Sequence, residues 1–396
     1  MSKIGIINST YKIGSTGRIA YELQQYINCH SENRAIAFYG RGPKQNDNEA
    51  FNFSLPLSVS LHGVFSRIFD RTGFYSSLST KRLIRRMKKE NIDTVILINL
   101  HGYYVNIKIL FKYFKEYKIK VFYALSDCWS FTGHCSHFTI FSCEKWKTGC
   151  YKCEHLNQYP KSILFDSSKQ NYRDKKKIFL SVNPTLILPC KWLQTMVGES
   201  FFKDTKSFVI RNGVDTSIFK KSSSDFKKTH NIENKKVILC ISQFWIAKKG
   251  IYDIIEVSKK LSDEFVIVLV GKMNVDVELP QNIIHIEQTY NVKEIVDIYS
   301  SSDVLFNPTY EDTYPTVNIE AAACELPVVC YKTGGAVESV DPNYIVEQGD
   351  IKKSVEDIIE LSSNKNLYAF PDINISKEQT YSQYLECISN KTESDN

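Results

Sequence analysis

The stretch PTYEDTYPTVNIEAAACELPVVCYKT, residues 308–333, carries the clearest fold signal of this 396-residue chain. An apolar run at residues 304–306 precedes it and predicts a buried strand, and the β-branched run at 327–331 predicts a second one. Between the two runs, a short acidic loop leads to Pro315, which suits the first turn of a helix because its missing N–H would be unpaired there anyway. Strand, loop, helix and strand in this order predict a βαβ unit of a parallel sheet.

The loop and the helix of this unit carry polar groups that suit a phosphorylated ligand. The backbone N–H groups of Thr316, Val317 and Asn318 are expected to form an anion site at the helix N-terminus. Asp312 lies in the preceding loop, and Glu320 lies about 7–8 Å further along the helix axis. Phosphate at the helix N-terminus and sugar hydroxyls on two carboxylates predict a nucleotide-sugar site.

The composition predicts two ordered domains in a cytoplasmic protein. Apolar residues make up 43% of the chain and charged residues only 24%, which excludes a disordered chain. No run approaches the roughly 18–20 apolar residues of a membrane span, and the N-terminal sequence lacks the apolar region of a signal peptide. In the cytoplasm, eleven cysteines favour metal ligands or free thiols over a disulfide framework.

The net charge of +6 hides a split between the two halves of the chain. Residues 1–200 carry a net charge of +15 and the remaining residues −9. No nucleic-acid-binding motif accompanies the basic half, so an anionic membrane surface or a lipid phosphate is the favoured partner and nucleic acid is not expected. Within residues 61–92, an apolar stripe at helical spacing precedes six basic residues, which fits either an interfacial helix on anionic lipid or a helix that packs on the sheet.

Three turns of the first half follow predicted strands. Glycines at a strand-to-helix turn let a ligand approach the backbone, although the same turn can be a tight connection and nothing more. That turn comprises Gly14, Ser15, Thr16 and Gly17. His101 follows the buried run at 93–99, and Asp127 follows the run at 120–125, so both are expected at the carboxyl edge of the sheet. The alternative interpretation is that His101 has only a structural role.

Four cysteines cluster in a long insert at about residues 128–155. Cys135, Cys143, Cys150 and Cys153 are separated by seven, six and two residues, which matches a closed tetrahedral zinc site. We expect structural zinc because four sulfurs leave no open position for catalysis, and unbound thiols are the alternative.

A polar stretch at residues 220–236 suggests a linker, after which a second α/β domain begins at 237–242. Its first strand-to-helix turn contains Lys248, Lys249 and Gly250. We predict an N-terminal domain at 1–208, a C-terminal domain at 209–375, and a final amphipathic helix and tail at 376–396 that returns to the N-terminal domain.

These motifs together resemble glycosyltransferase family 4, and within it the bacterial exopolysaccharide and colanic-acid-type transferases. The resemblance covers nearly the whole chain and rests on GSTGRIA, HGYYVN, DCWSFTGHC, RNGVD, KKG, EDTYPTVNIEAAAC and TGG followed by Glu338. It implies an α/β protein of the GT-B fold, in which two Rossmann-like doubly wound domains face a cleft.

The resemblance also implies roles for individual residues. Glu320 would hold the ribose hydroxyls, Asp312 would face the transferred sugar, and His101 would hydrogen-bond that sugar near the reacting carbon. Lys249 would neutralise the leaving diphosphate, so no catalytic metal is expected. The remaining donor-binding residues would be Gly14, Ser15, Thr16, Gly17, Asp127, Lys248, Thr316, Val317 and Asn318.

Three positions depart from the family pattern. No arginine precedes the lysine pair near residues 242–244, Ser126 stands where a histidine is usual, and Glu325 replaces a common glycine. Even so, the resemblance implies a retaining hexosyltransferase that moves a sugar from a nucleotide diphosphate to a lipid-linked glycan in capsule or exopolysaccharide synthesis. It would work in the cytoplasm, peripherally on the inner face of the plasma membrane. A GT-B-type sugar-nucleotide epimerase, a zinc-dependent hydrolase and a non-catalytic sugar-nucleotide-binding scaffold are the alternatives.

Overall fold

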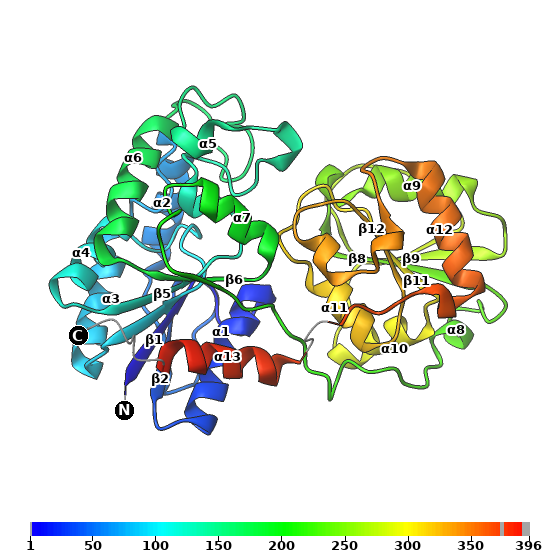
Figure 1. The fold of residues 1–396 in the computed structure, drawn as a ribbon, viewed down its shortest axis with the longest axis horizontal. Coiled ribbons are helices and arrows are strands. Elements are labelled where there is room, and N and C mark those ends of the chain that lie inside the picture. Colours follow the sequence, from blue (N-terminus) through cyan, green and yellow to red (C-terminus); the bar gives the residue numbers. More distant parts are fainter. Residues whose placement is uncertain (1, 373–375, 390–396) are drawn as a thin grey trace. The chain divides into compact units, whose positions relative to one another are not determined.

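Two parallel sheets, one in each half of the chain, organise the structure, which is a computed structural model that describes residues 2–372 and 376–389 (Figure 1). The chain divides into two units. Unit 1 comprises Met1–Ile210 and Tyr381–Asn396, and unit 2 comprises Arg211–Thr380. The division at residues 210 and 211 lies two residues from the boundary expected at 208 and 209.

The sheet of unit 1 has seven parallel strands in the order β3-β2-β1-β4-β5-β6-β7. The strands are β1 (Lys3–Asn8), β2 (Arg34–Tyr39), β3 (Ala50–Asn52), β4 (Thr94–Leu97), β5 (Lys120–Ala124), β6 (Thr185–Leu188) and β7 (Ser207–Val209). The order reverses between β1 and β4, which is the switch point of a doubly wound sheet. Strands such as β4 are buried along their whole length because helices cover both faces of such a sheet.

Helices flank this sheet, and the first of them packs on it through apolar side chains. The helices of unit 1 are α1 (Gly14–His30), α2 (Pro56–Phe69), α3 (Ser77–Glu90), α4 (Ile107–Glu116), α5 (Lys145–Thr148), α6 (Ser168–Phe179) and α7 (Lys191–Glu199). Leu23 and Ile27 of α1 pack on Ile4 and Ile96 of the central strands.

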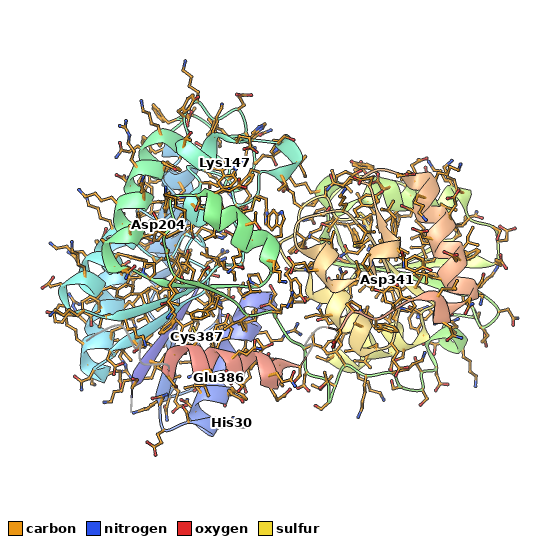
Figure 2. The ribbon with its side chains drawn as sticks, in the orientation of Figure 1. His30, Lys147, Asp204, Asp341, Glu386 and Cys387 are labelled. Carbon is orange, nitrogen blue, oxygen red and sulfur yellow. The ribbon has the colours of Figure 1, made fainter. Side chains whose placement is uncertain are left out.

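The final helix, α13 (Lys377–Ser389), begins in unit 2 and joins the core of unit 1 from Tyr381 onwards. Tyr381 lies in the same apolar cluster as α1, and its hydroxyl donates to Glu22 at 2.8 Å. Figure 2 labels Glu386 and Cys387 on this helix, and Cys387 packs on that cluster.

The sheet of unit 2 repeats the doubly wound pattern with the order β10-β9-β8-β11-β12-β13. Its strands are β8 (Lys236–Trp245), β9 (Phe265–Met273), β10 (Ile283–Ile286), β11 (Val304–Asn307), β12 (Val328–Tyr331) and β13 (Ile345–Val346). Its helices are α8 (Phe226–Thr229), α9 (Ile251–Lys260), α10 (Val292–Ser301), α11 (Thr316–Ala323) and α12 (Ile351–Ser363). The predicted α/β class with two Rossmann-like domains is confirmed.

The stretch at residues 308–333 forms the predicted βαβ unit. Strands β11 and β12 pair in parallel, with Leu305 opposite Val328, and α11 begins at Thr316 directly after Pro315. Glu325 follows the helix with a φ of +55°, the left-handed conformation in which glycine is common, so the glutamate pays a small backbone cost there.

The cysteine-containing insert has little regular structure but does have an apolar centre. The rings of Phe131 and Phe138 lie 5.5 and 4.8 Å from the buried ring of Trp146. Lys175 attaches the start of the insert to α6. Its buried Nζ donates hydrogen bonds to the carbonyl oxygens of Trp129 at 2.8 Å and Thr132 at 3.1 Å.

Across the described residues, no helix combines the length and hydropathy that a membrane span requires.

Burial makes the contribution of Lys175 to stability depend on pH. Burial lowers the pKa of Lys175 from its ordinary 10.5 to about 7, against nearby acids and thiols that raise it. Below pH 7, both folded and unfolded chains carry the charge, and burying it costs stability. Between pH 7 and about 10.5 the folded side chain is neutral, so this cost falls as the pH rises.

We therefore expect Lys175→Met to lower the free energy of unfolding of unit 1 by about 1–3 kcal/mol at pH 9–10, because two buried carbonyls lose a donor. The loss should be smaller at pH 7. Urea unfolding followed by tryptophan fluorescence at several pH values measures it, with the exposed Lys176→Met as control. A loss that is equal at pH 7 and pH 10 would contradict the assignment.

Candidate functional site

Loops that follow β8 and β11 meet at the carboxyl edge of the sheet in unit 2. The backbone N–H of Tyr310 donates to the carbonyl of Lys248 at 2.9 Å. Gly250 has a φ of +75°, and a Cβ atom there would lie 2.2 Å from the carbonyl oxygen of Pro308. Only glycine therefore permits this approach, which places the two lysines of one loop beside the acids of the other.

Two ion pairs join these loops. Lys248 Nζ lies 2.6 Å from Glu311 Oε2, and Lys249 Nζ lies 2.8 Å from Asp312 Oδ2. Lys249 also contacts the hydroxyl of Thr309 at 3.3 Å. Two residues with separately predicted roles, Lys249 and Asp312, are thus brought together and neutralise each other. A phosphate that binds Lys249 would have to compete with the carboxylate of Asp312.

The N-terminus of α11 lies in the same loop region. No side chain caps this helix, and no partner is seen for the N–H groups of Thr316 and Val317 among the described residues, which suits the expected anion site. Asn318 differs from the expectation. Its N–H is 3.3 Å from the carbonyl of Pro315, and its buried amide bonds Asn307 and Ser339, so its side chain holds the fold together.

Glu320 points toward α10 and is largely buried. Its residue is 6% exposed, and its Oε2 accepts a hydrogen bond from the hydroxyl of Tyr299 at 2.9 Å. A buried carboxylate requires such donors because an unpaired charge is costly away from water. Tyr299 was not predicted as a site residue. The only sequence signal for it is a polar aromatic side chain in an otherwise apolar helix face.

Two further family motifs of unit 2 are joined by an ion pair. Arg211 of RNGVD lies 3.2 Å from Glu338, which follows TGG. The N–H of Gly335 donates to the carbonyl of Thr313 at 3.0 Å, so the loop after β12 lies against the loop before α11. The residues near 242–244, where the expected arginine is absent, lie in the last part of β8.

His101 and Asp127 form the centre of a second polar cluster, in unit 1. His101 Nε2 lies 2.6 Å from Asp127 Oδ2. Burial pushes the pKa of Asp127 up, but the charge and hydrogen bond of His101 outweigh this effect and hold the pKa below its ordinary value. Asp127 therefore stays ionised at neutral pH, and its carboxylate accepts a hydrogen bond from the Nε2–H of His101.

The other ring nitrogen of His101 is occupied as well. Its Nδ1 lies 3.1 Å from the hydroxyl of Tyr159, a residue that the sequence analysis did not single out. With the Nε2 proton directed at Asp127, Nδ1 accepts from that hydroxyl, so neither nitrogen is free for a sugar in this arrangement. Tyr159 is half exposed, and burial is the main cause that raises the pKa of its hydroxyl, so it stays a neutral donor.

The glycine-containing turn lies near this cluster in unit 1. The loop of His101 packs on the end of β1, because a Cβ at Gly102 would lie 2.7 Å from the Cβ of Ser9. Gly17 packs equally closely on Thr10, which favours the tight-connection interpretation for this glycine. Gly14 has a φ of +69° with open space around it. Ser15 is exposed and Thr16 partly exposed, as ligand contacts would require.

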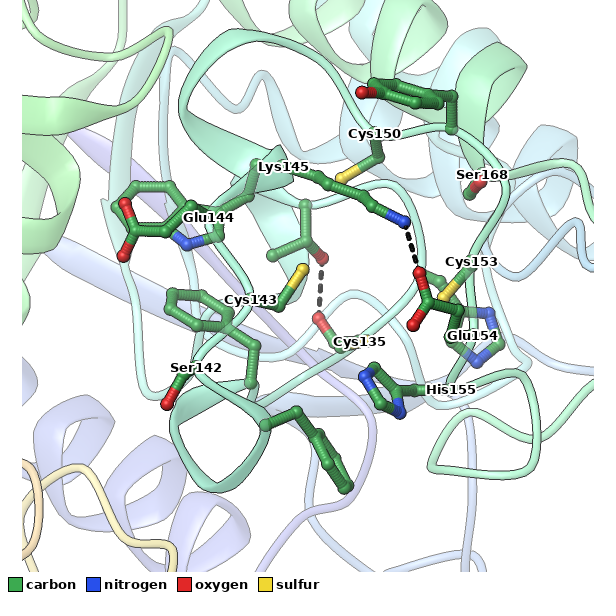
Figure 3. Close-up of a pocket in the computed structure, with 16 residues that line it drawn as sticks. Cys135, Ser142, Cys143, Glu144, Lys145, Cys150, Cys153, Glu154, His155 and Ser168 are labelled. Carbon is green, nitrogen blue, oxygen red and sulfur yellow. Dashed lines mark hydrogen bonds and ion pairs between the residues drawn. The ribbon is translucent and has the colours of Figure 1, made fainter.

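The four cysteines line one pocket of about 250 Å³ in the insert, together with His134 and His155 (Figure 3). The structure does not support the zinc site expected from their spacing. In residues 2–372 and 376–389, no three His, Cys, Asp or Glu side chains are placed to hold one metal ion. The free thiol of Cys135 instead donates a hydrogen bond to the sulfur of Cys153, and the sulfur of Cys150 accepts a hydrogen bond from the N–H of Gly133 at 3.1 Å. His134 is paired with Asp70 at 2.5 Å.

Comparison with known proteins identifies the class to which this architecture belongs. Residues 222–377, most of unit 2, match the family described as glycosyl transferases group 1. A protein of Escherichia coli (strain K12), named as a colanic acid biosynthesis glycosyl transferase, is 24% identical over 357 residues, which cover 86% of this chain and 83% of that protein. A Staphylococcus aureus capsular polysaccharide biosynthesis glycosyltransferase is 24% identical over 43% of this chain and 50% of its own.

Solved structures with the same fold agree with this class. Sucrose-phosphate synthase from Thermosynechococcus elongatus superposes with a TM-score of 0.71 over 98% of both chains, at 12% identity. The HepE protein of Anabaena in complex with UDP and glucose gives a TM-score of 0.67 over 98% of this chain and all of that chain, at 14% identity. The chain is a glycosyltransferase with the GT-B fold.

The pairing of Cys135 with Cys153 predicts unequal thiol reactivity. The hydrogen bond from Cys135 lowers the pKa of Cys153, whereas burial raises the pKa of Cys150 to about 12. Because the thiolate is the reactive form, iodoacetamide at pH 7 should alkylate Cys153 at least about tenfold faster than Cys150. Peptide mass spectrometry over time measures both rates.

The variant Cys135→Ala serves as the control, since it removes the hydrogen bond to Cys153 and leaves Cys150 in place. It should slow labelling of Cys153 alone. Equal labelling rates for Cys153 and Cys150 in the unmodified chain would show that the thiol pairing is absent in solution.

Proposed function

We propose that this glycosyltransferase transfers a hexose from a nucleotide diphosphate donor, with retention of configuration, to a lipid-linked glycan in the synthesis of a surface polysaccharide. The observation that carries the proposal is the gathering of Lys248, Lys249 and the N-terminus of α11 at the carboxyl edge of the sheet in unit 2, with Glu320 further along the same helix. Cations and free N–H groups suit a diphosphate, and a carboxylate suits ribose hydroxyls.

Departure of the diphosphate leaves positive charge on the sugar and negative charge on phosphate. Lys249 and the N-terminus of α11 would stabilise the leaving diphosphate, since fixed positive groups act most strongly where charge develops. The pairing with Asp312 keeps Lys249 in position before the donor arrives. Once phosphate replaces Asp312 as the partner of Lys249, the freed carboxylate can accept hydrogen bonds from the hydroxyls of the transferred sugar. No metal enters this account.

In unit 1, we assign His101 to the transferred sugar and Asp127 to the orientation of the His101 ring. The 2.6 Å contact between them selects the tautomer with the proton on Nε2. The sugar would then hydrogen-bond to Nδ1, which requires that the hydrogen bond between Nδ1 and the hydroxyl of Tyr159 breaks first. Gly14, Ser15, Thr16 and Gly17 remain proposed contacts of the donor through the turn before α1.

The polysaccharide assignment draws on the relatives named for colanic acid and capsular polysaccharide, and the nucleotide-sugar donor is supported by the neighbour solved with UDP and glucose. A lipid-linked acceptor follows if this chain extends such a glycan in the cytoplasm. That assignment would place the enzyme peripherally at the inner face of the plasma membrane.

A two-stage experiment tests the function. Thermal denaturation with UDP-, GDP- and dTDP-sugars identifies the donor, because a ligand at one hundred times its Kd adds about 2.7 kcal/mol of stability. The stabilising donor is then incubated with and without a lipid-linked acceptor, and the product anomer is determined by NMR. A glycoside that keeps the anomeric configuration of the donor and forms only when acceptor is present supports the proposal. An epimerised sugar without acceptor, free sugar, or binding without turnover would support the alternatives instead.

The ribose assignment predicts a strong effect of Glu320→Gln. Loss of a charge-assisted hydrogen bond to the donor should raise its Kd about 10- to 100-fold, because such bonds contribute about 1.5–3 kcal/mol. Isothermal titration with the nucleoside diphosphate measures it. Tyr299→Phe is the matched control, since it removes the hydroxyl on Glu320 and keeps the charge, and it should weaken binding far less. An unchanged Kd in Glu320→Gln would place the ribose elsewhere.

The arrangement around His101 predicts opposite effects for its two neighbours. Asp127→Asn should lower kcat about 10- to 100-fold, because the amide no longer holds the required tautomer. Tyr159→Phe should raise kcat/KM about 2- to 10-fold, because the sugar no longer displaces a hydrogen bond from Nδ1. Steady-state kinetics with the identified donor measures both variants. If kcat/KM fell in both variants, Tyr159 would assist His101 and would not compete with the sugar.

A further inference from the structure

Helix α2 is oriented with its polar side chains inward and its apolar side chains outward. The residues it buries are His62 and Ser66. Its apolar stripe at positions i, i+4, i+7 and i+8 lies on the surface, with Leu57 71% and Leu61 44% exposed. The other exposed apolar residues of this helix are Val64, Phe65 and Phe69. Of the two alternatives for this region, burial of the apolar side chains holds for α3, which buries Leu83 and Met87, but not for α2.

Hydrogen bonds of the buried histidine fix this orientation. His62 Nδ1 lies 2.8 Å from the hydroxyl of Ser76, and its Nε2 accepts the backbone N–H of Gly73 at 3.1 Å. Burial lowers the pKa of His62 to about 3, so the ring is neutral and can serve as that acceptor. Rotating α2 to bury its leucines would break both bonds, and the apolar face therefore stays outside.

A second apolar segment extends this face. Residues 163–165, Ile-Leu-Phe, are all exposed, and Leu164 reaches 68%. The N–H of Ile163 donates to the carbonyl of Arg67 at 2.7 Å, which attaches the segment to the end of α2. The ring of Phe165 stacks on Phe69 with centroids 5.4 Å apart. We call the exposed apolar residues of α2 together with residues 163–165 the α2 apolar surface.

Cations outnumber acids in the elements that carry this surface, and Asp166, which follows Phe165, is the exposed acid that adjoins it. Residues 51–89 contain eight lysines and arginines and a single acid, Asp70. Asp70 is buried against His134, so its charge does not face solvent. Arg67 and Lys161, which adjoin the attached segment, are both exposed. An anionic surface would therefore be attracted to this face and not repelled.

We propose that the α2 apolar surface inserts into the headgroup region of an anionic lipid bilayer, with Leu57, Leu61 and Leu164 as the leading side chains. A large apolar face rimmed by cations fits a bilayer surface, which offers hydrocarbon beneath negative headgroups. Insertion of this kind is shallow, about 5–10 Å into the interface. The proposal rests on the peripheral location proposed above and names the surface responsible for it. Its test needs neither donor nor acceptor, so it can fail while sugar transfer holds.

Flotation of the full chain with lipid vesicles tests the proposal. Vesicles of phosphatidylcholine alone are compared with vesicles that contain about a third phosphatidylglycerol, at low and at high salt. The chain should float with the anionic vesicles at low salt, and high salt should weaken binding because it screens the cationic rim. The double variant Leu61→Ser with Leu164→Ser should lower the partition coefficient at least about tenfold, since each removes one anchoring side chain.

Two variants separate the contributions. The matched control, Leu367→Ser with Phe370→Ser, changes apolar residues of unit 2 that are 47% and 43% exposed, and it should bind as the unmodified chain does. Arg67→Gln with Lys161→Gln should weaken binding to the anionic vesicles and make it less sensitive to salt. Circular dichroism verifies that each variant is folded.

Three results would overturn the proposal. They are no flotation with anionic vesicles, equal loss in the unit 2 control, and a concentration-dependent dimer in light scattering that Leu61→Ser with Leu164→Ser abolishes while vesicles bind neither form. The last result would make the α2 apolar surface an interface between two copies of the chain.

Discussion

The close approach of two loops at Gly250 is the constraint on which the proposed donor region of unit 2 depends. A side chain at this position would overlap the carbonyl oxygen of Pro308, so only a residue without Cβ lets the loop after β8 lie on the loop after β11. This contact sets the spacing of Lys248 and Lys249 from the acids beyond Pro308. It also places both lysines on the same sheet edge as the start of α11.

The electrostatics of this region follow from that contact. Two adjacent lysines repel each other, and so do two adjacent carboxylates. The loops offset this repulsion because they pair each lysine with one carboxylate. Such pairs hold long lysine side chains in one geometry before a ligand binds, which lowers the ordering cost of binding. A diphosphate carries more charge than one carboxylate, so it can replace the acid on Lys249 without leaving that cation unpaired.

Unit 1 uses hydrogen bonds of histidines for two different purposes. His101 lies between an ionised acid and a tyrosine hydroxyl, which defines its tautomer and limits its access to ligand. His62 lies between a serine hydroxyl and a backbone N–H, which keeps α2 turned with its leucines outward. In both cases a ring with two distinct nitrogens orients the structure around it, once burial and a partner choose which nitrogen carries the proton.

The two-domain α/β architecture and the loop positions of most polar residues could be predicted from the amino-acid sequence, because apolar runs with intervening turns predict strands and parallel strands end at one edge. The βαβ unit around α11 was predictable in this way, and so was the start of the helix after Pro315. Tertiary structure alone decided which side chains face each other. The pairing of Lys249 with Asp312, the hydroxyl of Tyr159 on His101 and the outward stripe of α2 all join residues far apart in the chain or depend on which helix face is buried. The thiols show the same limit, because spacing along the chain counts possible ligands but does not place their sulfur atoms around one point.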